Sequence, residues 1–163
     1  MEVKNCKNCG RLYNYIGGVY RLCPECMRKL EEKFQEVKDY IEEITSLYLE
    51  EEKNNLKEKN NIMDYVHILF LIKFFDRYGK FFVTLADAGM YSFIIDAANI
   101  IMEKEYKDNY STSDDADFLK KKTYELYFYS GAMVNVFLQW QKNGKNITPE
   151  ELAGIITDYR RIS

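Results

Sequence analysis

The stretch LYFYSGAMVNVFLQWQKNGKNITPEEL, from Leu126 to Leu152, does most to decide the fold of this chain. Its first half is apolar around the whole circumference of a helix, so a helix over 117–143 must bury more than one face. Gly144 is suited to end that helix, because glycine readily adopts the left-handed conformation that follows a last turn. The motif TPEE (148–151) then supplies an N-cap, a proline at the first helical position and a capping-box acid for a closing helix.

Upstream of this stretch, apolar residues recur every three or four positions over 27–53 and predict a long helix. The stripe is heptad-like and contains Met27, Leu30, Phe34, Val37, Ile41, Ile44 and Tyr48. Core packing within one chain is the simpler interpretation of this stripe, and an intermolecular coiled coil is the alternative.

The middle of the chain predicts further helices over 62–78 and 90–106, after the polar linker NNLKEKNN (54–61). Ser113 or Asp114 can cap the helix that follows. The chain has only 2 Pro and 8 Gly in 163 residues, which favours long uninterrupted helices. We therefore expect a mainly α fold, a helical bundle, behind a small N-terminal module.

All four cysteines lie in that N-terminal module, as two C-x2-C pairs separated by thirteen residues, namely Cys6, Cys9, Cys23 and Cys26. Each pair can present two thiolates to one ion, and four protein ligands leave no coordination position open for water. We therefore expect one structural Zn²⁺ per chain in a zinc ribbon, with a hairpin turn at Gly17-Gly18. Two disulfides, or four free thiols, are the alternatives.

The chain is thus predicted to consist of a zinc ribbon (1–26), a connecting helix (27–53) and a helical body (54–163). Residues 1–29 carry six basic side chains against two acidic ones, whereas the net charge of the whole chain is −3. This basic bias is enough for weak attraction only, and it is not the footprint of a general nucleic-acid binder.

The sequence gives no indication of export or membrane insertion. Its N-terminus lacks the apolar stretch of a signal peptide. The most apolar run, VHILFLIKFF (66–75), is interrupted by His67 and Lys73 and is too short to span a bilayer. We expect a cytoplasmic protein without a membrane partner, in a reducing compartment that keeps the thiols available to a metal.

Aromatic residues in the body could line an apolar pocket for a small ligand between helices, and the set is Phe70, Phe74, Tyr78, Phe82, Tyr91 and Phe93. Ordinary core filling is the simpler interpretation, because aromatic residues at helical spacing normally pack inside. His67 is the only histidine and is expected to be a packed residue rather than a ligand. An enzyme is not expected, since the sequence has no phosphate-binding glycine loop, no paired-carboxylate motif and no fifth cysteine.

Two segments resemble known families. VKNCKNCGRLYNYIGGVYRLCPECMRKLEEKFQEVKDYI (3–41) resembles the N-terminal segment of a small zinc-ribbon protein encoded in Firmicute flagellar operons. In that family a short helix-turn-helix-like tail follows, and this chain departs from the pattern after Ile41. FYSGAMVNVFLQWQKNGKNITPEELAGII (128–156) resembles the end of the ligand-binding domain of Firmicute-type TetR-family regulators, through Gly131, Trp140, Gly144 and the PEEL motif at 149–152.

The second resemblance implies a homodimer, in which the last two helices of each subunit form a four-helix interface. The residues expected there are Phe137, Trp140, Leu152, Ile155, Ile156 and Tyr159. TetR regulators begin with a three-helix DNA-binding domain, and this chain has the zinc ribbon in its place.

Two functions remain open. The first is a regulator-like homodimeric sensor whose ribbon contacts DNA or protein. The alternative is an assembly factor that does not bind DNA and uses the ribbon to dock a protein partner.

Overall fold

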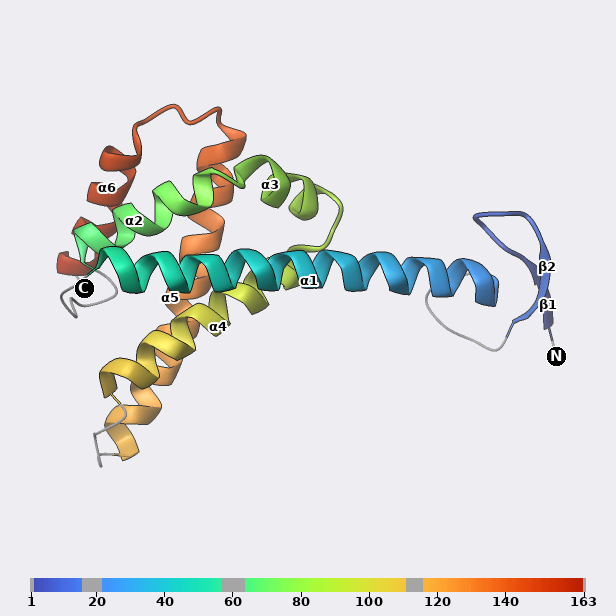
Figure 1. Cartoon of the computed structure of the whole chain (residues 1–163), viewed down its shortest axis with the longest axis horizontal. Helices are drawn as coiled ribbons and strands as arrows, with labels where there is room; N and C mark the ends of the chain where they lie inside the picture. The colour runs from blue at the N-terminus through green and yellow to red at the C-terminus, as the bar shows by residue number, and fades with distance from the viewer. Residues whose placement is uncertain (1, 16–21, 57–63, 111–115, 163) are drawn as a thin grey trace. The chain divides into compact units, whose positions relative to one another are not determined.

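The computed structural model describes residues 2–15, 22–56, 64–110 and 116–162, which form two compact units, Met1–Tyr40 and Ile41–Ser163 (Figure 1). In chain order the elements are β1 (Glu2–Asn5), β2 (Leu12–Tyr15), α1 (Pro24–Asn55), α2 (Tyr65–Asp76), α3 (Gly79–Asp87), α4 (Tyr91–Tyr110), α5 (Ala116–Lys142) and α6 (Pro149–Ile162). The prediction of a mainly α fold with a small N-terminal strand pair is confirmed. The three-part division of the chain at 26 and 53 stays a prediction.

In the first unit, β1 and β2 pair antiparallel, with Glu2 opposite Tyr15 and Asn5 opposite Leu12. The sequence analysis did not predict the strand at 2–5, and the predicted turn at Gly17-Gly18 lies outside the described residues. The loop between the two strands contains the first cysteine pair, so the hairpin presents these thiols at one end.

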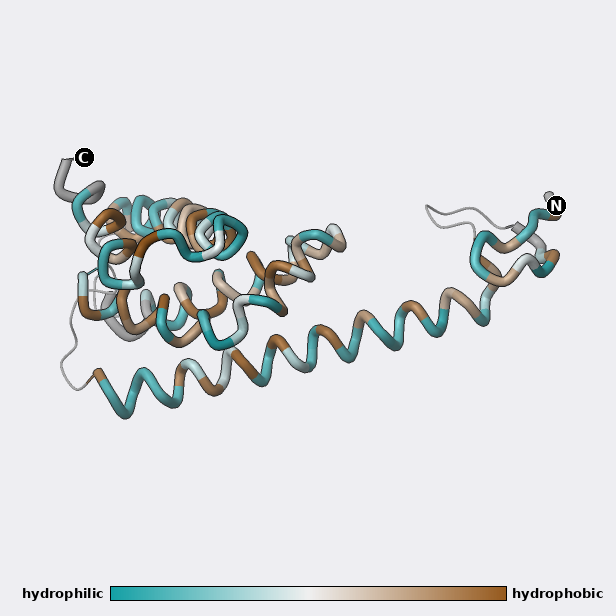
Figure 2. Tube along the Cα trace, turned by 90° about the horizontal axis from the view of Figure 1, so that it is seen from above, coloured by the Kyte–Doolittle hydropathy of each residue, from teal (hydrophilic) through white to brown (hydrophobic). Residues whose placement is uncertain are grey.

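Helix α1 begins at Pro24, earlier than predicted, because proline is suited to the first helical position. It contributes to both units, since the division falls between Tyr40 and Ile41. Figure 2 shows hydrophilic and hydrophobic positions alternating along this helix, as in an amphipathic helix. Within the second unit Ile44 and Tyr48 of the predicted stripe are 1% and 0% exposed, which confirms that this part of the stripe is core.

The second unit is built from helix pairs. Helix α4 packs against α5, α3 packs against both, and α2 packs against α6. Two side-chain hydrogen bonds join α4 to α5. Tyr106 Oη donates to the Leu119 carbonyl (3.0 Å), and Tyr127 Oη donates to Glu103 Oε1 (2.9 Å). Of the described residues, Ile68 and Ile72 on α2 are among the most completely buried. This packing leaves a cavity between the helices, described below.

Local sequence motifs set the helix ends at the C-terminal part of the body. Gly144 has a φ of +70°, and its amide donates to the Gln141 carbonyl (3.0 Å), so it ends α5 as predicted. The Thr148 amide donates to Glu151 Oε2 (2.8 Å), and the Glu151 amide donates to Thr148 Oγ1 (3.2 Å). This reciprocal pair is the predicted capping box of α6.

At the start of α2, Asp64 accepts a hydrogen bond from the His67 amide (2.8 Å) and caps the helix. That cap explains why α2 begins a few residues later than the predicted 62. The predicted caps Ser113 and Asp114 lie outside the described residues. Within the described ranges, every helix is too short or too polar to cross a bilayer.

Candidate functional site

The structure brings the four cysteines together at the end of the β1–β2 hairpin and the start of α1. Their sulfur atoms all lie within 4.8 Å of one another, and Cys6, Cys23 and Cys26 are buried while Cys9 is exposed. All four lie in the described residues, and none forms a disulfide. Tyr13 and Leu22 pack against the buried thiols.

The spacing of the sulfur atoms fits a tetrahedral metal site. Four sulfurs that each lie about 2.3 Å from one zinc ion are about 3.8 Å apart. Cys9 Sγ and Cys23 Sγ are 3.7 Å apart, which is far beyond a disulfide bond of about 2.05 Å. The four cysteines can therefore bind a metal ion in this arrangement.

The first cysteine loop is held by its own backbone. The Cys6 amide donates to the Arg11 carbonyl (2.8 Å), and the Gly10 amide donates to the Cys6 carbonyl (2.9 Å). Gly10 has a φ of +75°, a conformation that side chains with a Cβ rarely adopt. The glycine thus closes the turn that follows the first cysteine pair.

The surroundings shift the pKa values of two of the thiols in opposite directions. Burial alone raises the pKa of Cys6, but hydrogen bonds from the backbone of Cys23, Cys9 and Asn8 lower that pKa to about 6. For Cys26, the Asn8 side chain lowers the pKa through an Nδ2–Sγ hydrogen bond of 3.4 Å. Burial and the neighbouring thiols outweigh it and raise the pKa of Cys26 to about 11. Four clustered thiols can all lose their protons only if a cation joins them.

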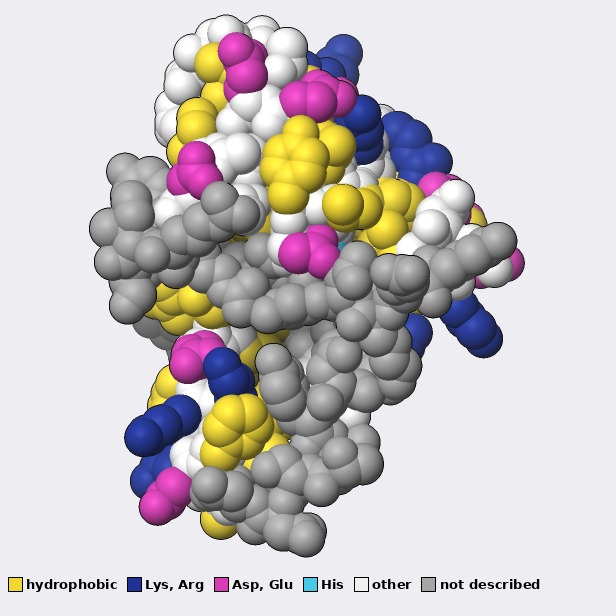
Figure 3. Space-filling view, turned by 90° about the vertical axis from the view of Figure 1, so that its left-hand side faces the viewer, with side chains coloured by type: hydrophobic (Ala, Val, Ile, Leu, Met, Phe, Trp, Pro, Cys, Tyr) yellow, Lys and Arg dark blue, Asp and Glu magenta, His cyan; other side chains and the backbone are white. Residues whose placement is uncertain are grey.

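Charged residues beside the metal site are mostly paired. Arg11 Nη1 lies 2.5 Å from Glu25 Oε2, and Lys29 Nζ lies 3.3 Å from the other oxygen of the same carboxylate. Arg28 forms an ion pair with Glu32 one turn along α1. These acids offset much of the basic bias of the N-terminal segment. Figure 3 shows a face of the helical body, which also carries described side chains of both charge signs.

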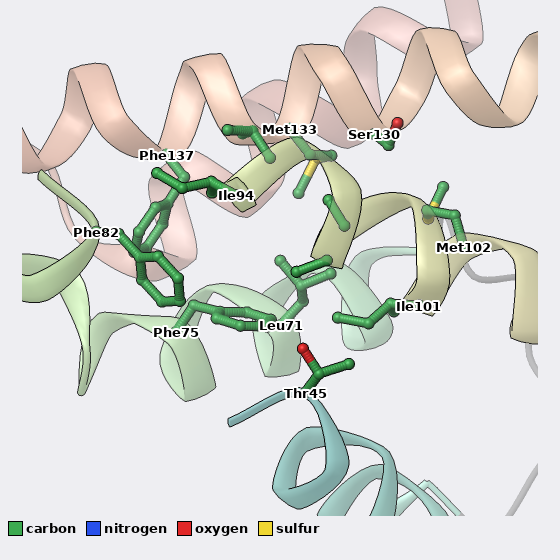
Figure 4. Close-up of a pocket in the computed structure, with 13 residues that line it drawn as sticks. Thr45, Leu71, Phe75, Phe82, Ile94, Ile101, Met102, Ser130, Met133 and Phe137 are labelled. Atoms are coloured by element: carbon green, nitrogen blue, oxygen red, sulfur yellow. The ribbon is translucent and has the colours of Figure 1, made fainter. Parts of the chain in front are cut away.

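A second candidate site is a cavity of about 70 Å³ inside the body. Figure 4 shows lining side chains that point into it from several helices. The lining residues, contributed by α1 to α5, are Thr45, Leu71, Phe75, Phe82, Ile94, Ala97, Ala98, Ile101, Met102, Ser130, Met133, Val134 and Phe137. All of them are apolar except Thr45 and Ser130.

One of the six aromatic residues expected around a ligand, Phe82, lines this cavity. Phe70 and Phe74 instead surround Tyr48, with ring centroids 5.8 Å and 5.3 Å from it, and Tyr78 packs against Phe74 at 5.6 Å. Tyr91 and Phe93 are half-buried on α4 and do not line the cavity. Most of the lining side chains that were not predicted are aliphatic and methionine residues of α4 and α5. The two adjacent small residues Ala97 and Ala98 on α4 were the sequence feature that could have indicated a cavity there.

Three of the residues expected at a dimer interface lie in the core of the single chain. Phe137, Trp140 and Leu152 are 8%, 4% and 4% exposed, and Trp140 Nε1 donates to the Ile147 carbonyl (2.9 Å). Ile155 is 48% exposed, Ile156 is half-buried, and the side chain of Tyr159 lies outside the described residues. Other apolar side chains project outward from α5, namely Tyr124, Tyr127, Phe128 and Val136.

His67 is buried, as expected, and belongs to a polar network that the sequence did not reveal. Its Nε2 lies 2.7 Å from Glu52 Oε1 and 3.0 Å from Tyr48 Oη. Tyr48 Oη also donates to the same carboxylate oxygen (2.7 Å). The network joins α1 to α2 within the second unit.

Comparison with known families identifies the body. Residues 67–161 match the model for the transcriptional regulator C-terminal region of the TetR type, and this match covers more than half of the chain. The chain belongs to this family. None of the curated proteins and none of the solved structures compared with it matches.

The match confirms the TetR-like body and points to a transcriptional regulator. It begins within α2 and extends into α6, so it contains most of the residues around the cavity. The cysteine cluster and α1 lie before the matched region.

Proposed function

We propose that this protein is a zinc-binding, homodimeric transcriptional regulator in which a TetR-type body senses a signal and the N-terminal ribbon contacts DNA or a protein. The observation that carries the proposal is the combination of a regulator C-terminal region over 67–161 with a four-thiol cluster at 6–26. The cluster stands where regulators of this type have their DNA-binding domain. The ribbon is therefore the candidate output module.

Zinc is the proposed metal because four cysteines form a closed tetrahedral site, which suits a structural ion. Two observations support zinc: Cys9 Sγ and Cys23 Sγ are 3.7 Å apart, and backbone groups donate hydrogen bonds to Cys6 Sγ. The site has no ligand position left for a substrate, so its role is to fold the ribbon.

Homodimerisation is proposed through the outward face of α5 together with α6. Tyr124 and Phe128 are 68% and 71% exposed one helical turn apart, and Val136 is 37% exposed two turns further along. Ile155 adds an exposed apolar side chain on α6. Exposed aromatic side chains at this spacing are typical of an interface.

The dimer is tested by sedimentation of the full chain. Phe128→Glu places a charge on the proposed face and should convert dimers to monomers. Thr123→Glu, an exposed position on another side of the same helix, is the matched control and should stay dimeric. A monodisperse monomer for the unmodified protein would contradict this part of the proposal.

A second candidate function, docking of a protein partner without DNA, is favoured by the surface of the hairpin. Val3 and Leu12 are 58% and 73% exposed, and the strand register puts them on the same face of the sheet. Acidic side chains also form ion pairs with Arg11, Arg28 and Lys29. These pairs reduce the positive charge that could attract the phosphates of DNA.

Gel shifts with genomic DNA fragments at low and high salt separate the two functions. A regulator that binds DNA through the ribbon should lose affinity steeply as salt rises. Lys7→Gln, in the first cysteine loop, should weaken binding, whereas Lys53→Gln, at the far end of α1, should not. Absence of DNA binding, together with capture of a specific protein that Leu12→Ser abolishes, would favour the docking function instead.

A further inference from the structure

We infer that Cys9 is the site at which hydroperoxides oxidise this protein, and that the oxidised Cys9 forms a disulfide with Cys23 and thereby releases the metal. The inference rests on the proposed metal-folded ribbon, and it adds a way in which that ribbon is regulated. Three observations single out Cys9 among the four cysteines: its exposure, a cation beside it and the distance to a second sulfur.

Cys9 is the cysteine of the cluster that solvent can reach. Its side chain is exposed, whereas Cys6, Cys23 and Cys26 are only 3%, 5% and 9% exposed. Partly buried apolar side chains also pack against these three. A hydroperoxide in water can therefore approach the Cys9 sulfur directly, but it can approach the others only after the ribbon opens.

Arg11 lies close enough to the Cys9 sulfur to interact with its charge. The pKa of Arg11 is raised, first by its hydrogen bond to Glu25 and also by the negative charge of Cys9. The guanidinium therefore places a positive charge near the sulfur that attacks the oxidant. Such a charge stabilises the leaving oxygen of a hydroperoxide, which becomes negative as the O–O bond breaks.

A second sulfur lies within reach of an oxidised Cys9. Cys9 Sγ and Cys23 Sγ are 3.7 Å apart, and a disulfide bond needs a separation of about 2.05 Å. Cys9 lies in the loop between β1 and β2, and Cys23 directly precedes α1. A small movement of the two side chains can therefore close the gap and join the loop to the start of the helix.

The first chemical step is attack of the Cys9 thiolate on one oxygen of the hydroperoxide, which breaks the O–O bond. The sulfur becomes a sulfenic acid, and the other oxygen takes a proton and leaves as an alcohol, or as water when the oxidant is hydrogen peroxide. The Cys23 thiolate then attacks the Cys9 sulfur, an S–S bond forms, and the hydroxyl takes a proton and leaves as water. The two sulfurs lose two electrons in total, and the O–O bond accepts them.

Oxidation should leave the metal with too few ligands. The disulfide removes Cys9 and Cys23, so Cys6 and Cys26 remain, whereas a closed zinc site needs four ligands. The ion should leave, and the ribbon should lose its fold and its contact with DNA or protein. Reduction of the disulfide by a dithiol, with return of zinc, should restore both.

The test adds hydrogen peroxide to the zinc-loaded full chain and measures the released zinc with a chromogenic chelator. Close to one zinc ion should leave for each disulfide formed, and a dithiol with added zinc should reverse the change. Trypsin cleaves after Lys7 and separates Cys6 from Cys9, so mass spectrometry can identify the bonded cysteines. Retention of zinc by an unmodified cluster in excess peroxide, or a first disulfide other than Cys9–Cys23, would overturn the inference.

Two histidine variants separate Cys9 from the buried ligands. Cys9→His removes the exposed thiolate but keeps a fourth ligand, because zinc also binds three thiolates and one imidazole. Its release of zinc in peroxide should be slower by about tenfold or more. Cys6→His is the matched control, because it changes a buried ligand and should release zinc nearly as fast as the unmodified protein. Equal rates in the two variants would contradict a special role for Cys9.

A chemical trap for sulfenic acid gives a second measurement if either variant fails to bind zinc. Added to the unmodified protein together with peroxide, the trap should label Cys9 before the three buried cysteines. Earlier labelling of Cys6, Cys23 or Cys26 would overturn the inference.

The zinc and disulfide measurements do not depend on what the ribbon contacts. If the ribbon contacts neither DNA nor protein, the proposed regulator is lost and the oxidation of Cys9 stands. If the ribbon binds DNA or a protein and keeps both its partner and its zinc in excess peroxide, the regulator stands and the oxidation of Cys9 is lost. Elemental analysis of the untreated protein reports separately on the metal, and a metal-free chain would overturn this inference.

Discussion

The ribbon and the helical body of this chain are stabilised in opposite ways. Among the described residues of the ribbon, the core consists of three buried cysteines with Tyr13 and Leu22 packed against them. The body buries large apolar side chains from every one of its helices, including Ile68, Ile72 and Phe82. A small module with so little apolar surface needs a metal, whereas a longer helical body can rely on burial.

A single side-chain deletion should therefore have a larger effect on the stability of the ribbon than on the stability of the body. In the ribbon, loss of one sulfur should remove a ligand of the proposed metal and with it most of the stability of the module. In the body, loss of one apolar side chain leaves a void that the remaining core tolerates at a limited energetic cost. Substitutions in each unit test this difference in stability.

The largest effect is expected from removal of the metal ligands. Cys23→Ser together with Cys26→Ser should unfold the ribbon, because bound zinc contributes on the order of 10 kcal/mol to such a module. Most of the helical circular dichroism should remain, since the body has its own core and caps. If the whole chain instead unfolds in one step when a chelator is added, the body also depends on the metal for its stability.

A smaller effect is expected from a cavity made in the body. Ile72 is 1% exposed, so Ile72→Ala should lower the free energy of unfolding by about 3 kcal/mol. Ile100→Ala on α4 is the matched control, because Ile100 is 52% exposed and its loss should cost less than about 0.5 kcal/mol. Denaturant titration followed by circular dichroism measures both. If the Ile72→Ala variant also bound zinc much more weakly than the unmodified protein, the ribbon would depend on the body for its stability.

The buried polar network should matter less than the apolar core. Tyr48→Phe removes the hydroxyl that donates to Glu52 and leaves that carboxylate with one partner fewer. The expected cost is about 1–2 kcal/mol, measured by the same denaturant titration. Tyr65→Phe, on α2, removes a hydroxyl from an exposed side chain and should be neutral. Equal effects of the two changes would mean that the network contributes nothing specific.

The smallest effect is expected at the capping box of α6, and it should depend on pH. Hydrogen bonds from the Thr148 backbone and side chain lower the pKa of Glu151, so the folded value lies below the unfolded one. The stabilisation is therefore complete above the unfolded pKa and is lost as pH falls through the folded pKa. Glu151→Ala should destabilise the body near neutral pH and have little effect in acid. Glu151→Gln keeps an acceptor without a charge and should show a weaker pH dependence.

The features that the sequence predicted well are those encoded in a few adjacent residues. The spacing of the cysteines, the end of α5 at Gly144 and the capping box at 148–151 each depend on local geometry, and the structure confirms them. The strand at 2–5 was missed because a four-residue strand is defined by its partner rather than by its own pattern.

The cavity and the outward face of α5 were harder to predict, because both depend on how the helices pack. A helix that is apolar all round does not reveal which face meets its own core. Phe137 and Trp140 face inward, whereas Tyr124 and Phe128 face outward. Likewise, a cavity lies where packing is incomplete, and no periodicity marks such a place.

The proposal that a bound metal folds the cysteine module N-terminal to the TetR-type body is tested most directly by elemental analysis of the full chain. Protein purified without added metal should contain close to one zinc ion per chain, and Cys23→Ser together with Cys26→Ser should contain almost none. A metal-free unmodified protein whose N-terminal cysteines form disulfides would contradict the claim.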